Sequence, residues 1–535
     1  MRLNNSYQLF ILSLVSGLMC FLAWPPLGFV GFIFFAWIPL LHIHDVASKK
    51  WRFVFLLYLS LLTWNAATTW WIWNASAPGA AMAIFINSAI MLLPWLGYRT
   101  IQKKAGRFLG YVSLVFFWLS FEYLHLQDWG LSWPWLTLGN AFASNPELIQ
   151  WYEYTGTSGG TLWILLINIF LYEVIRLGSL NGLRNKTFHR AFVPLSALFI
   201  LPVIFSFLLK KKYDHKTSNA PAYDVIIIQP NIDPYLKVGG LEFSKLLEEM
   251  IALSRKKTDS STRLLIWPET ALYVNTGFDE LRLKESLELA PLFDFLNEFP
   301  QLNLLTGIES YRIYNEKKSV YSKAIPNSVN YYEDYNGAVL INHSGPLHYY
   351  HKSMLVPGVE TLPRFLMFLG PVFEEFGGST GGYAKENIRE AMPVSNHFRI
   401  APAICYESIY GEYLSNFVAK DADLIAIITN DGWWGNTPGY KQHMSYARLR
   451  AIETRRWVAR SANTGISCFI DPVGNVLDAQ EWWTPSVIKR KVPALKEQTF
   501  YVRFGDIISK VALAGTCMFL VYIIFGLFRR RKKNQ

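Results

Sequence analysis

The sequence predicts a polytopic α-helical membrane domain with eight transmembrane helices, joined to an α/β layered domain. Of the 535 residues, 51% are hydrophobic and only 17% are charged, whereas an ordinary soluble domain has roughly 25% charged residues. Long apolar runs gather towards the two ends of the chain, and the segment between them alternates short β-rich runs with helical patterns. This composition excludes disordered, collagen-like and disulfide-rich proteins.

Eight apolar runs have the length that a membrane-spanning helix needs, about 17–25 residues. The first is interpreted as a retained helix, because Trp24-Pro25-Pro26 stands where a signal peptide would have small residues for cleavage. The runs lie at 7–23, 27–43, 53–72, 81–98, 109–126, 160–176, 191–209 and 507–528.

The basic residues alternate between successive loops. Segments after the second, fourth, sixth and eighth runs carry Lys and Arg, whereas 73–80 and 127–159 carry none. By the positive-inside rule, both termini are predicted to lie in the cytoplasm and residues 210–505 outside. Lys210-Lys211-Lys212 breaks the alternation, but long translocated domains largely escape the rule. The net charge of +11 therefore indicates membrane orientation, and no nucleic-acid partner is expected.

These patterns divide the chain into five expected parts. They are a membrane domain with helices one to seven (1–209), a polar linker (210–222), an α/β domain (223–495), a return segment with the eighth helix (496–528) and a basic tail (529–535). Strand candidates are 224–228, 263–267, 303–308, 337–341, 399–404, 424–429, 458–462 and 466–470, and helix candidates are 241–256, 286–299 and 442–456.

Three short segments carry residues that could do chemistry. Glu269 follows a strand candidate, at the carboxyl end where open α/β sheets bind ligands; a surface carboxylate is the plainer alternative. Lys352 lies in an apolar, proline-containing stretch, and a solvated loop charge is its alternative. Cys405 stands where a strand candidate turns into a helical pattern, which can present a thiolate to a cleft. A lone cysteine is, however, most often buried and inert.

A cysteine nucleophile also needs a base. His351, His397 and His443 could each form a Cys-His dyad, and nothing in their local sequence selects one. The four cysteines are scattered and the sequence has no CxxC or HExxH pattern. Neither a disulfide framework nor a metal site is therefore expected, and no cofactor is expected either.

Taken together, these segments resemble the nitrilase, or carbon-nitrogen hydrolase, superfamily. The resemblance lies in Trp-Pro-Glu at 267–269, the segment from Lys352 to Glu360 and Ile-Cys-Tyr-Glu at 404–407. It continues in 229–231, 430–435, His443 and 448–465. Eight spans attached to such a domain, with WPWLTLGN at 133–140, resemble the apolipoprotein N-acyltransferase family. The resemblance implies a nitrilase-like αββα sandwich for the α/β domain.

The resemblance also implies an activity. Members transfer a fatty acyl chain from a phospholipid to the free α-amino group of the N-terminal diacylglyceryl-cysteine of apolipoproteins, the last step of bacterial lipoprotein maturation. The implied mechanism is ping-pong, through a thioester on Cys405. The implied location is the bacterial inner membrane, with the catalytic domain on the periplasmic face. The implied partners are the phospholipid donor and the apolipoprotein acceptor, and a monomer is expected.

The family's catalytic set is Glu-Lys-Cys, which falls on Glu269, Lys352 and Cys405. Glu269 would be the general base, and Lys352 would stabilise the oxyanion together with the backbone N–H of Tyr406. The resemblance implies that Glu360 orients Lys352, and that Tyr406 and Glu407 shape the pocket. No metal takes part in this scheme.

Several local departures from the family pattern leave these residues in place. Val356-Pro357-Gly358-Val359-Glu360 replaces Val-Pro-Phe-Gly-Glu, so a Phe is missing while Glu360 keeps its spacing. Gln229-Pro230-Asn231 replaces Gln-Gly-Asn, and Asp431-Gly432-Trp433-Trp434-Gly435 replaces Asp-Ala-Trp-Phe-Gly. The apolar stretch 361–375 is either core packing or a mobile arm that gates lipid entry.

Two other functions are alternatives to acyl transfer. A membrane-tethered amidohydrolase would use the same three residues with water as the second nucleophile, but eight spans exceed what a tether needs. A transporter with an outer sensing domain would carry ionisable groups inside its spans. Here the span interiors are nearly free of acids and bases apart from Glu122 and Glu173, with Lys510 near one end.

Overall fold

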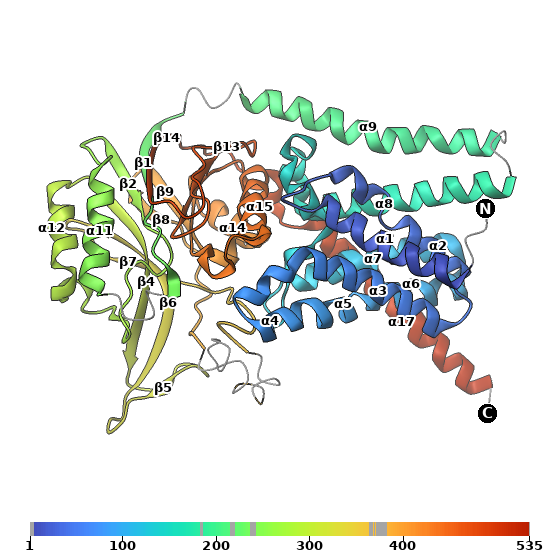
Figure 1. The fold of residues 1–535 in the computed structure, drawn as a ribbon, viewed down its shortest axis with the longest axis horizontal. Helices are drawn as coiled ribbons and strands as arrows, with labels where there is room; N and C mark the ends of the chain where they lie inside the picture. The colour runs from blue at the N-terminus through green and yellow to red at the C-terminus, as the bar shows by residue number, and fades with distance from the viewer. Residues whose placement is uncertain are drawn as a thin grey trace. The chain divides into compact units, whose positions relative to one another are not determined.

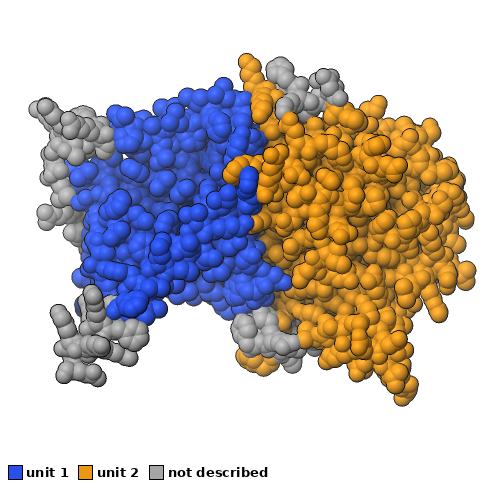
Figure 2. Space-filling view, turned by 180° about the vertical axis from the view of Figure 1, so that it is seen from behind, with its two compact units in different colours: residues 1–70, 79–210, 504–535 blue, residues 71–78, 211–503 orange. Residues whose placement is uncertain are grey.

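The structure, a computed structural model, consists of two compact units. It describes residues 5–181, 186–214, 220–235, 242–362, 368, 370 and 382–533. The first unit comprises 1–70, 79–210 and 504–535, and the second comprises 71–78 and 211–503. Figure 2 colours the two units separately. The short segment 71–78 thus belongs to the second unit, although its neighbours in the chain belong to the first.

The first unit is helical. Among the described residues, seven helices are long and apolar enough to cross a membrane, so the chain is a multi-pass membrane protein. Its helices are α1 (Ser6–Ala23), α2 (Ile38–Val46), α3 (Lys50–Thr69), α4 (Ala77–Ala81), α5 (Asn87–Ile90), α6 (Leu92–Ala105), α7 (Arg107–His125), α8 (Tyr152–Asn181), α9 (Lys186–Asp214, which continues into the second unit) and α17 (Ile507–Lys533).

The second predicted span, 27–43, is not one continuous helix. A short 3₁₀ helix, Val30–Phe34, is followed by α2, and the apolar stretch Val30–Val46 is shorter than the other seven. Asn168 of α8 satisfies the backbone at the break: its Oδ1 accepts from the Trp37 N–H at 2.8 Å, and its Nδ2 donates to the Ile33 carbonyl at 2.9 Å. An interrupted helix is tolerated in an apolar unit where protein groups satisfy the freed backbone. The count of eight spans stays a prediction.

The second unit is built on two β-sheets. One has the strand order β14-β1-β2-β4-β6-β5, with β3 beside β4 and β7 beside β6, and the other has the order β13-β12-β11-β10-β9-β8. Their strands are β1 (Ala222–Gln229), β2 (Thr262–Ile266), β3 (Phe278–Asp279), β4 (Asn303–Tyr314), β5 (Lys323–Ala324), β6 (Tyr331–Asn342), β7 (His348–His351), β8 (Met392–Ser395), β9 (Phe398–Ile404), β10 (Leu424–Thr429), β11 (Trp457–Ala462), β12 (Cys468–Ile470), β13 (Val476–Leu477) and β14 (Ser486–Pro493).

Helices cover the outer faces of both sheets, as Figure 1 shows. The helices α11 (Phe243–Arg255) and α12 (Ala290–Glu298) bury apolar side chains against the first sheet. The helices α14 (Gly411–Ala419) and α15 (Pro438–Thr454) pack on the second. The inner faces meet where Ser461 of β11 donates a hydrogen bond to the Ile228 carbonyl of β1 at 2.8 Å. The unit is therefore the predicted αββα sandwich.

Buried apolar runs made the central strands predictable. The strand candidate 424–429 coincides with β10, all of whose residues are buried, as expected for a parallel central strand. Residues 466 and 467, predicted as the start of a strand, precede β12, which begins at Cys468. The helix α9 runs on to Asp214, so the first part of the predicted linker is helical. Most of the segment 361–375 lies outside the described residues.

Candidate active site

Glu269 lies just beyond the carboxyl end of β2. The strand ends at Ile266, and the buried Trp267 anchors the exit by donating from its indole N–H to Ser254 Oγ at 3.0 Å. The Glu269 carboxylate is buried and accepts hydrogen bonds on both oxygens. Oε1 accepts from Asn336 at 3.0 Å and from Lys352 at 3.1 Å, and Oε2 accepts from the Asn430 N–H at 3.2 Å. The surface-carboxylate alternative is therefore wrong.

Lys352 follows β7 and is 1% exposed. Its ammonium lies 3.1 Å from Glu269 Oε1 and 2.7 Å from Glu360 Oε1. Burial would lower the pKa of the Lys352 ammonium, but the two carboxylates raise that pKa well above its usual value. Lys352 is thus a buried, permanently charged group and not a solvated loop residue.

Glu360 closes the far side of the Lys352 ammonium. Its Oε2 accepts from the Val356 N–H at 2.8 Å, which ties the Val-Pro-Gly-Val-Glu loop back on itself. Its Oε1 accepts from Lys352 and, at 3.2 Å, from Asn336. Lys352 is held between two carboxylates, which is the arrangement expected of a residue that Glu360 orients.

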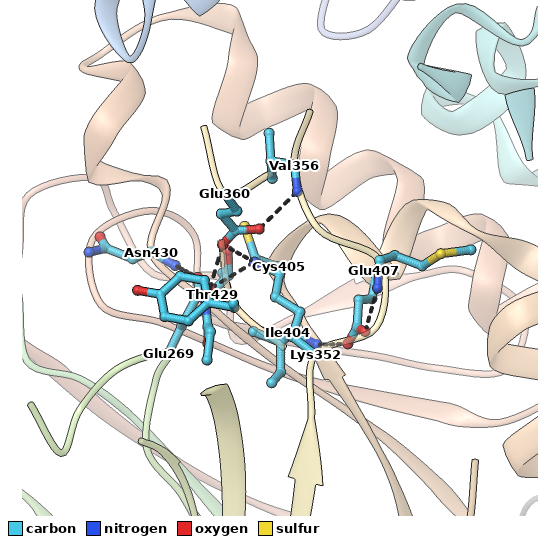
Figure 3. A network of polar contacts seen from close by, with 12 residues as sticks. Glu269, Lys352, Val356, Glu360, Ile404, Cys405, Glu407, Thr429 and Asn430 are labelled. Carbon is cyan, nitrogen blue, oxygen red and sulfur yellow. Dashed lines mark hydrogen bonds and ion pairs between the residues drawn. The ribbon is translucent and has the colours of Figure 1, made fainter. Parts of the chain in front are cut away.

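Cys405 begins a short 3₁₀ helix, Cys405–Ile409, directly after β9. Its φ is +51°, a left-handed backbone conformation that residues other than glycine seldom adopt and that recurs at functional sites. Burial and the Glu269 charge raise the pKa of the Cys405 thiol, while Lys352 and a hydrogen bond with Thr429 lower it in part. The net shift is upward, so the resting group is a thiol that needs a base. Figure 3 shows Cys405, Glu269, Lys352 and Glu360 gathered in one cluster.

Glu407 connects the lysine segment to the cysteine turn. Its buried carboxylate accepts from the Ser353 N–H at 2.7 Å and from the Ile404 N–H at 2.9 Å, and also from the hydroxyls of Tyr350 and Tyr413. Burial raises the pKa of Glu407 and these donors lower it in part. Glu407 thus fixes the spacing of Lys352 and Cys405. The adjacent Tyr406 is buried, and its ring lies edge-to-face with that of Tyr410, with the ring centroids 5.4 Å apart.

Known proteins share both parts of this chain. Residues 227–499, more than half of the chain, match the family model described as carbon-nitrogen hydrolase. The chain belongs to the carbon-nitrogen hydrolase family. Residues 16–170 match a second model, described as the apolipoprotein N-acyltransferase N-terminal domain. The resemblance predicted from the sequence is therefore confirmed.

Three relatives of this carbon-nitrogen hydrolase align with nearly its whole length. A protein of Chlorobaculum tepidum named apolipoprotein N-acyltransferase is 29% identical over 94% of each chain. Proteins of the same name from Pseudomonas syringae pv. tomato and Pasteurella multocida are each 26% identical, over 92% and 99% of this chain and 92% and 98% of theirs. A nitrilase-superfamily structure from Saccharomyces cerevisiae covers 51% of this chain and 90% of its own, with 15% identity and a TM-score of 0.36.

The three candidate histidines of this carbon-nitrogen hydrolase lie in different surroundings. His351 is held between Glu280 and Glu386, at 2.6 Å and 2.8 Å, and His397 is exposed. His443 approaches Cys405, but its Nε2 lies 3.0 Å from the Cys405 carbonyl oxygen. His443 thus contacts the main chain of Cys405, whereas Glu269 is drawn in the same cluster as Cys405 in Figure 3.

Sequence reasoning missed Asn336, Asn430 and Thr429 as members of the site. Asn336, in β6, donates from its side-chain amide to both Glu269 and Glu360 and so bridges the two carboxylates. A polar Asn at a buried position of a strand was the available signal, because buried polar side chains are normally hydrogen-bonded for a reason. Asn430 contributes through its backbone N–H, which the residue type does not reveal.

Proposed function

We propose that the protein transfers a fatty acyl chain from a phospholipid to the free α-amino group of the N-terminal diacylglyceryl-cysteine of apolipoproteins, as the last step of bacterial lipoprotein maturation. The observation that carries the proposal is the buried Glu269–Lys352 ion pair beside the Cys405 thiol, in a chain whose first part matches the acyltransferase N-terminal domain. Three relatives of that name each match more than nine-tenths of the chain.

In the first half-reaction, Glu269 takes the Cys405 proton while Sγ attacks the ester carbonyl carbon of the phospholipid. The Lys352 ammonium and the Tyr406 N–H stabilise the tetrahedral oxyanion. One such donor is worth about 3–4 kcal/mol of transition-state stabilisation. The carbon–oxygen bond then breaks. Glu269 returns its proton to the departing lysophospholipid alkoxide, which leaves a thioester on Cys405.

In the second half-reaction, the free amine of the acceptor attacks the thioester carbonyl carbon. Glu269 takes a proton from the amine, and Lys352 again faces the oxyanion. The carbon–sulfur bond breaks, and Glu269 returns the proton to the Cys405 thiolate. Overall, an amide replaces an ester. This exchange lowers the free energy, so no nucleotide is consumed.

The reaction is proposed to occur at the outer face of the bacterial inner membrane. Both substrates are lipids held in a bilayer, which accounts for a multi-pass membrane unit on a hydrolase-type enzyme. The alternating loop charges support cytoplasmic termini and a periplasmic catalytic unit. The enzyme is proposed to act as a monomer.

The test separates a transferase from a tethered amidohydrolase. Purified protein incubated with phospholipid alone should accumulate a fatty-acyl mass on the Cys405 peptide, removable by neutral hydroxylamine. A diacylglyceryl peptide with a free N-terminal amine should discharge it and become N-acylated, whereas the N-acetylated peptide should not. The proposal is wrong if no acyl mass forms and free fatty acid appears at the same rate with and without the amine.

A further inference from the structure

A second polar constellation lies behind the nucleophile, on the side of its carbonyl oxygen. Ser408 Oγ lies 2.9 Å from His443 Nε2, and His443 Nδ1 lies 3.0 Å from Asp431 Oδ1. These are the residue types of a hydrolytic Ser-His-Asp triad. Their exposed fractions, however, are 1%, 0% and 0%, and the Ser408 hydroxyl donates to the Cys405 carbonyl at 2.8 Å. Because that hydroxyl donates its proton to a main-chain carbonyl, the constellation is engaged with the Cys405 main chain.

The direction of these hydrogen bonds follows from the proton count. Ser408 has one hydroxyl proton, and it goes to the Cys405 carbonyl. His443 Nε2, 3.0 Å from that same carbonyl oxygen, must then be the donor, because a carbonyl can only accept. The Cys405 oxygen therefore receives two hydrogen bonds, one from Ser408 and one from His443.

Asp431 and Arg460 hold His443 in the orientation that this bond requires. Asp431 accepts from Arg460 at 2.6 Å and contacts His443 Nδ1, and Arg460 lies 3.1 Å from that nitrogen. Burial would raise the pKa of the Asp431 carboxyl, but Arg460 and His443 lower it to about 2, so it is ionised. The ring of Trp434 packs edge-to-face with the imidazole, with the ring centroids 5.5 Å apart. The imidazole is thus held at its far nitrogen and by the ring of Trp434.

Holding the Cys405 carbonyl fixes more than one atom. The carbonyl of Cys405 and the N–H of Tyr406 belong to one planar trans peptide, so they point in opposite directions. Any rotation of this plane would turn the Tyr406 N–H away from its target.

We propose that His443, together with Ser408, is a positioning residue that clamps the Cys405–Tyr406 peptide plane and so aims the Tyr406 N–H at the oxyanion. The inference rests on the proposed function, in which that N–H faces the tetrahedral intermediate. His443 touches neither the thiol proton nor the substrate in this role. It acts on the rate of acyl transfer to Cys405 and leaves the reactivity of the thiol itself unchanged.

The experiment compares two reactions of Cys405 in the full-length protein. Acylation by phospholipid, or by a p-nitrophenyl fatty ester, passes through an oxyanion, whereas alkylation by iodoacetamide does not. We expect Ser408→Ala and His443→Gln to slow acylation roughly 10- to 100-fold, mainly in kcat and not in KM, because a misaimed donor forfeits part of the 10²–10³ that one such group supplies. Alkylation should stay within about threefold of wild type, because thiol and base are untouched.

A matched control is Ser415→Ala in α14, a buried serine whose hydroxyl donates to the Glu412 carbonyl at 2.8 Å within its own helix. It should acylate like wild type. Acylation at the wild-type rate in both site variants overturns the clamp, and so does a parallel fall in alkylation. If His443→Gln does not fold, Ser408→Ala decides. Wild-type protein that acylates from the nitrophenyl ester and not from phospholipid would refute the proposed function and leave the clamp testable.

Discussion

At the scale of single residues, the charge on Lys352 is the feature that activity should depend on most. Replacing it by Met keeps the apolar stem and removes the ammonium that Glu269 and Glu360 hold at 3.1 Å and 2.7 Å. We expect Lys352→Met to slow thioester formation by about two orders of magnitude or more, because one oxyanion donor is worth that much. Single-turnover acylation of Cys405, followed by mass spectrometry, measures it.

The control for that variant is Lys323→Met, which removes a partly exposed lysine paired with Asp334 at 2.8 Å. Its acylation rate should match wild type. A rate within a few-fold of wild type for Lys352→Met would show that the ammonium is structural. Lys352→Arg is not expected to restore activity, since the guanidinium is larger than an ammonium and planar.

His351 gives the protein a pH-dependent contribution to stability. Burial would lower the pKa of His351, but Glu280 and Glu386 raise it above its usual value, and Arg312, which pairs with both acids, is the other charge in the cluster. A raised pKa means that the folded state binds the proton more tightly. The stabilisation is therefore complete below about pH 6.5 and is lost as the pH rises through the folded-state value.

Replacing His351 by Gln should accordingly lower the melting temperature more at pH 6 than at pH 9. The melting temperature at each pH can be measured by intrinsic tryptophan fluorescence during heating in detergent. His343→Gln, at an exposed histidine that contacts Asn297 at 2.8 Å, is the matched control and should show no such difference. An equal loss at both pH values for His351→Gln would contradict the charged imidazole.

At the scale of elements, the close packing of β4 against the exit from β2 positions the candidate base. A Cβ on Gly307 would lie 2.6 Å from Glu269 Cα and 2.3 Å from the Thr270 nitrogen, both backbone atoms that cannot turn aside. Gly307→Ala should therefore displace Glu269, cost about 1–3 kcal/mol of stability and slow acylation. Gly31→Ala, where no atom lies within 4 Å of the added Cβ, should leave both unchanged. Wild-type acylation by Gly307→Ala would show that Glu269 tolerates movement.

The elements also show where prediction from the sequence stops. Strands such as β10 can be predicted from the sequence, because a strand that is buried on both faces consists almost entirely of apolar residues. The second span, 27–43, looks continuous by hydropathy, and its interruption depends on Asn168, which lies far away in the sequence. In the site, Glu269, Lys352 and Cys405 were each ambiguous alone and were selected by resemblance. Asn336 was not, because its role exists only once two strands are paired.

At the scale of the whole molecule, the orientation in the membrane is open to a direct test. In a cysteine-free background, Lys103→Cys should be cytoplasmic and Lys317→Cys, in an exposed turn of the second unit, should be periplasmic. An impermeant maleimide should then label position 317 in intact spheroplasts and position 103 only after lysis. The reverse pattern would invert the proposed topology.

The segment 71–78 has a consequence for how this chain can be divided. It leads from α3 into the second unit and back to α4. Within that unit the Trp71 ring packs at a tilt against Trp434, with the ring centroids 4.7 Å apart, and its indole N–H donates to Gln442 at 3.2 Å. Trp434 in turn packs on His443. A single cut in the chain therefore cannot release the complete second unit. A fragment starting at residue 211 would lack Trp71, which packs against Trp434 and donates to Gln442. During synthesis, Trp71 therefore leaves the ribosome 371 residues before Gln442, its hydrogen-bond partner.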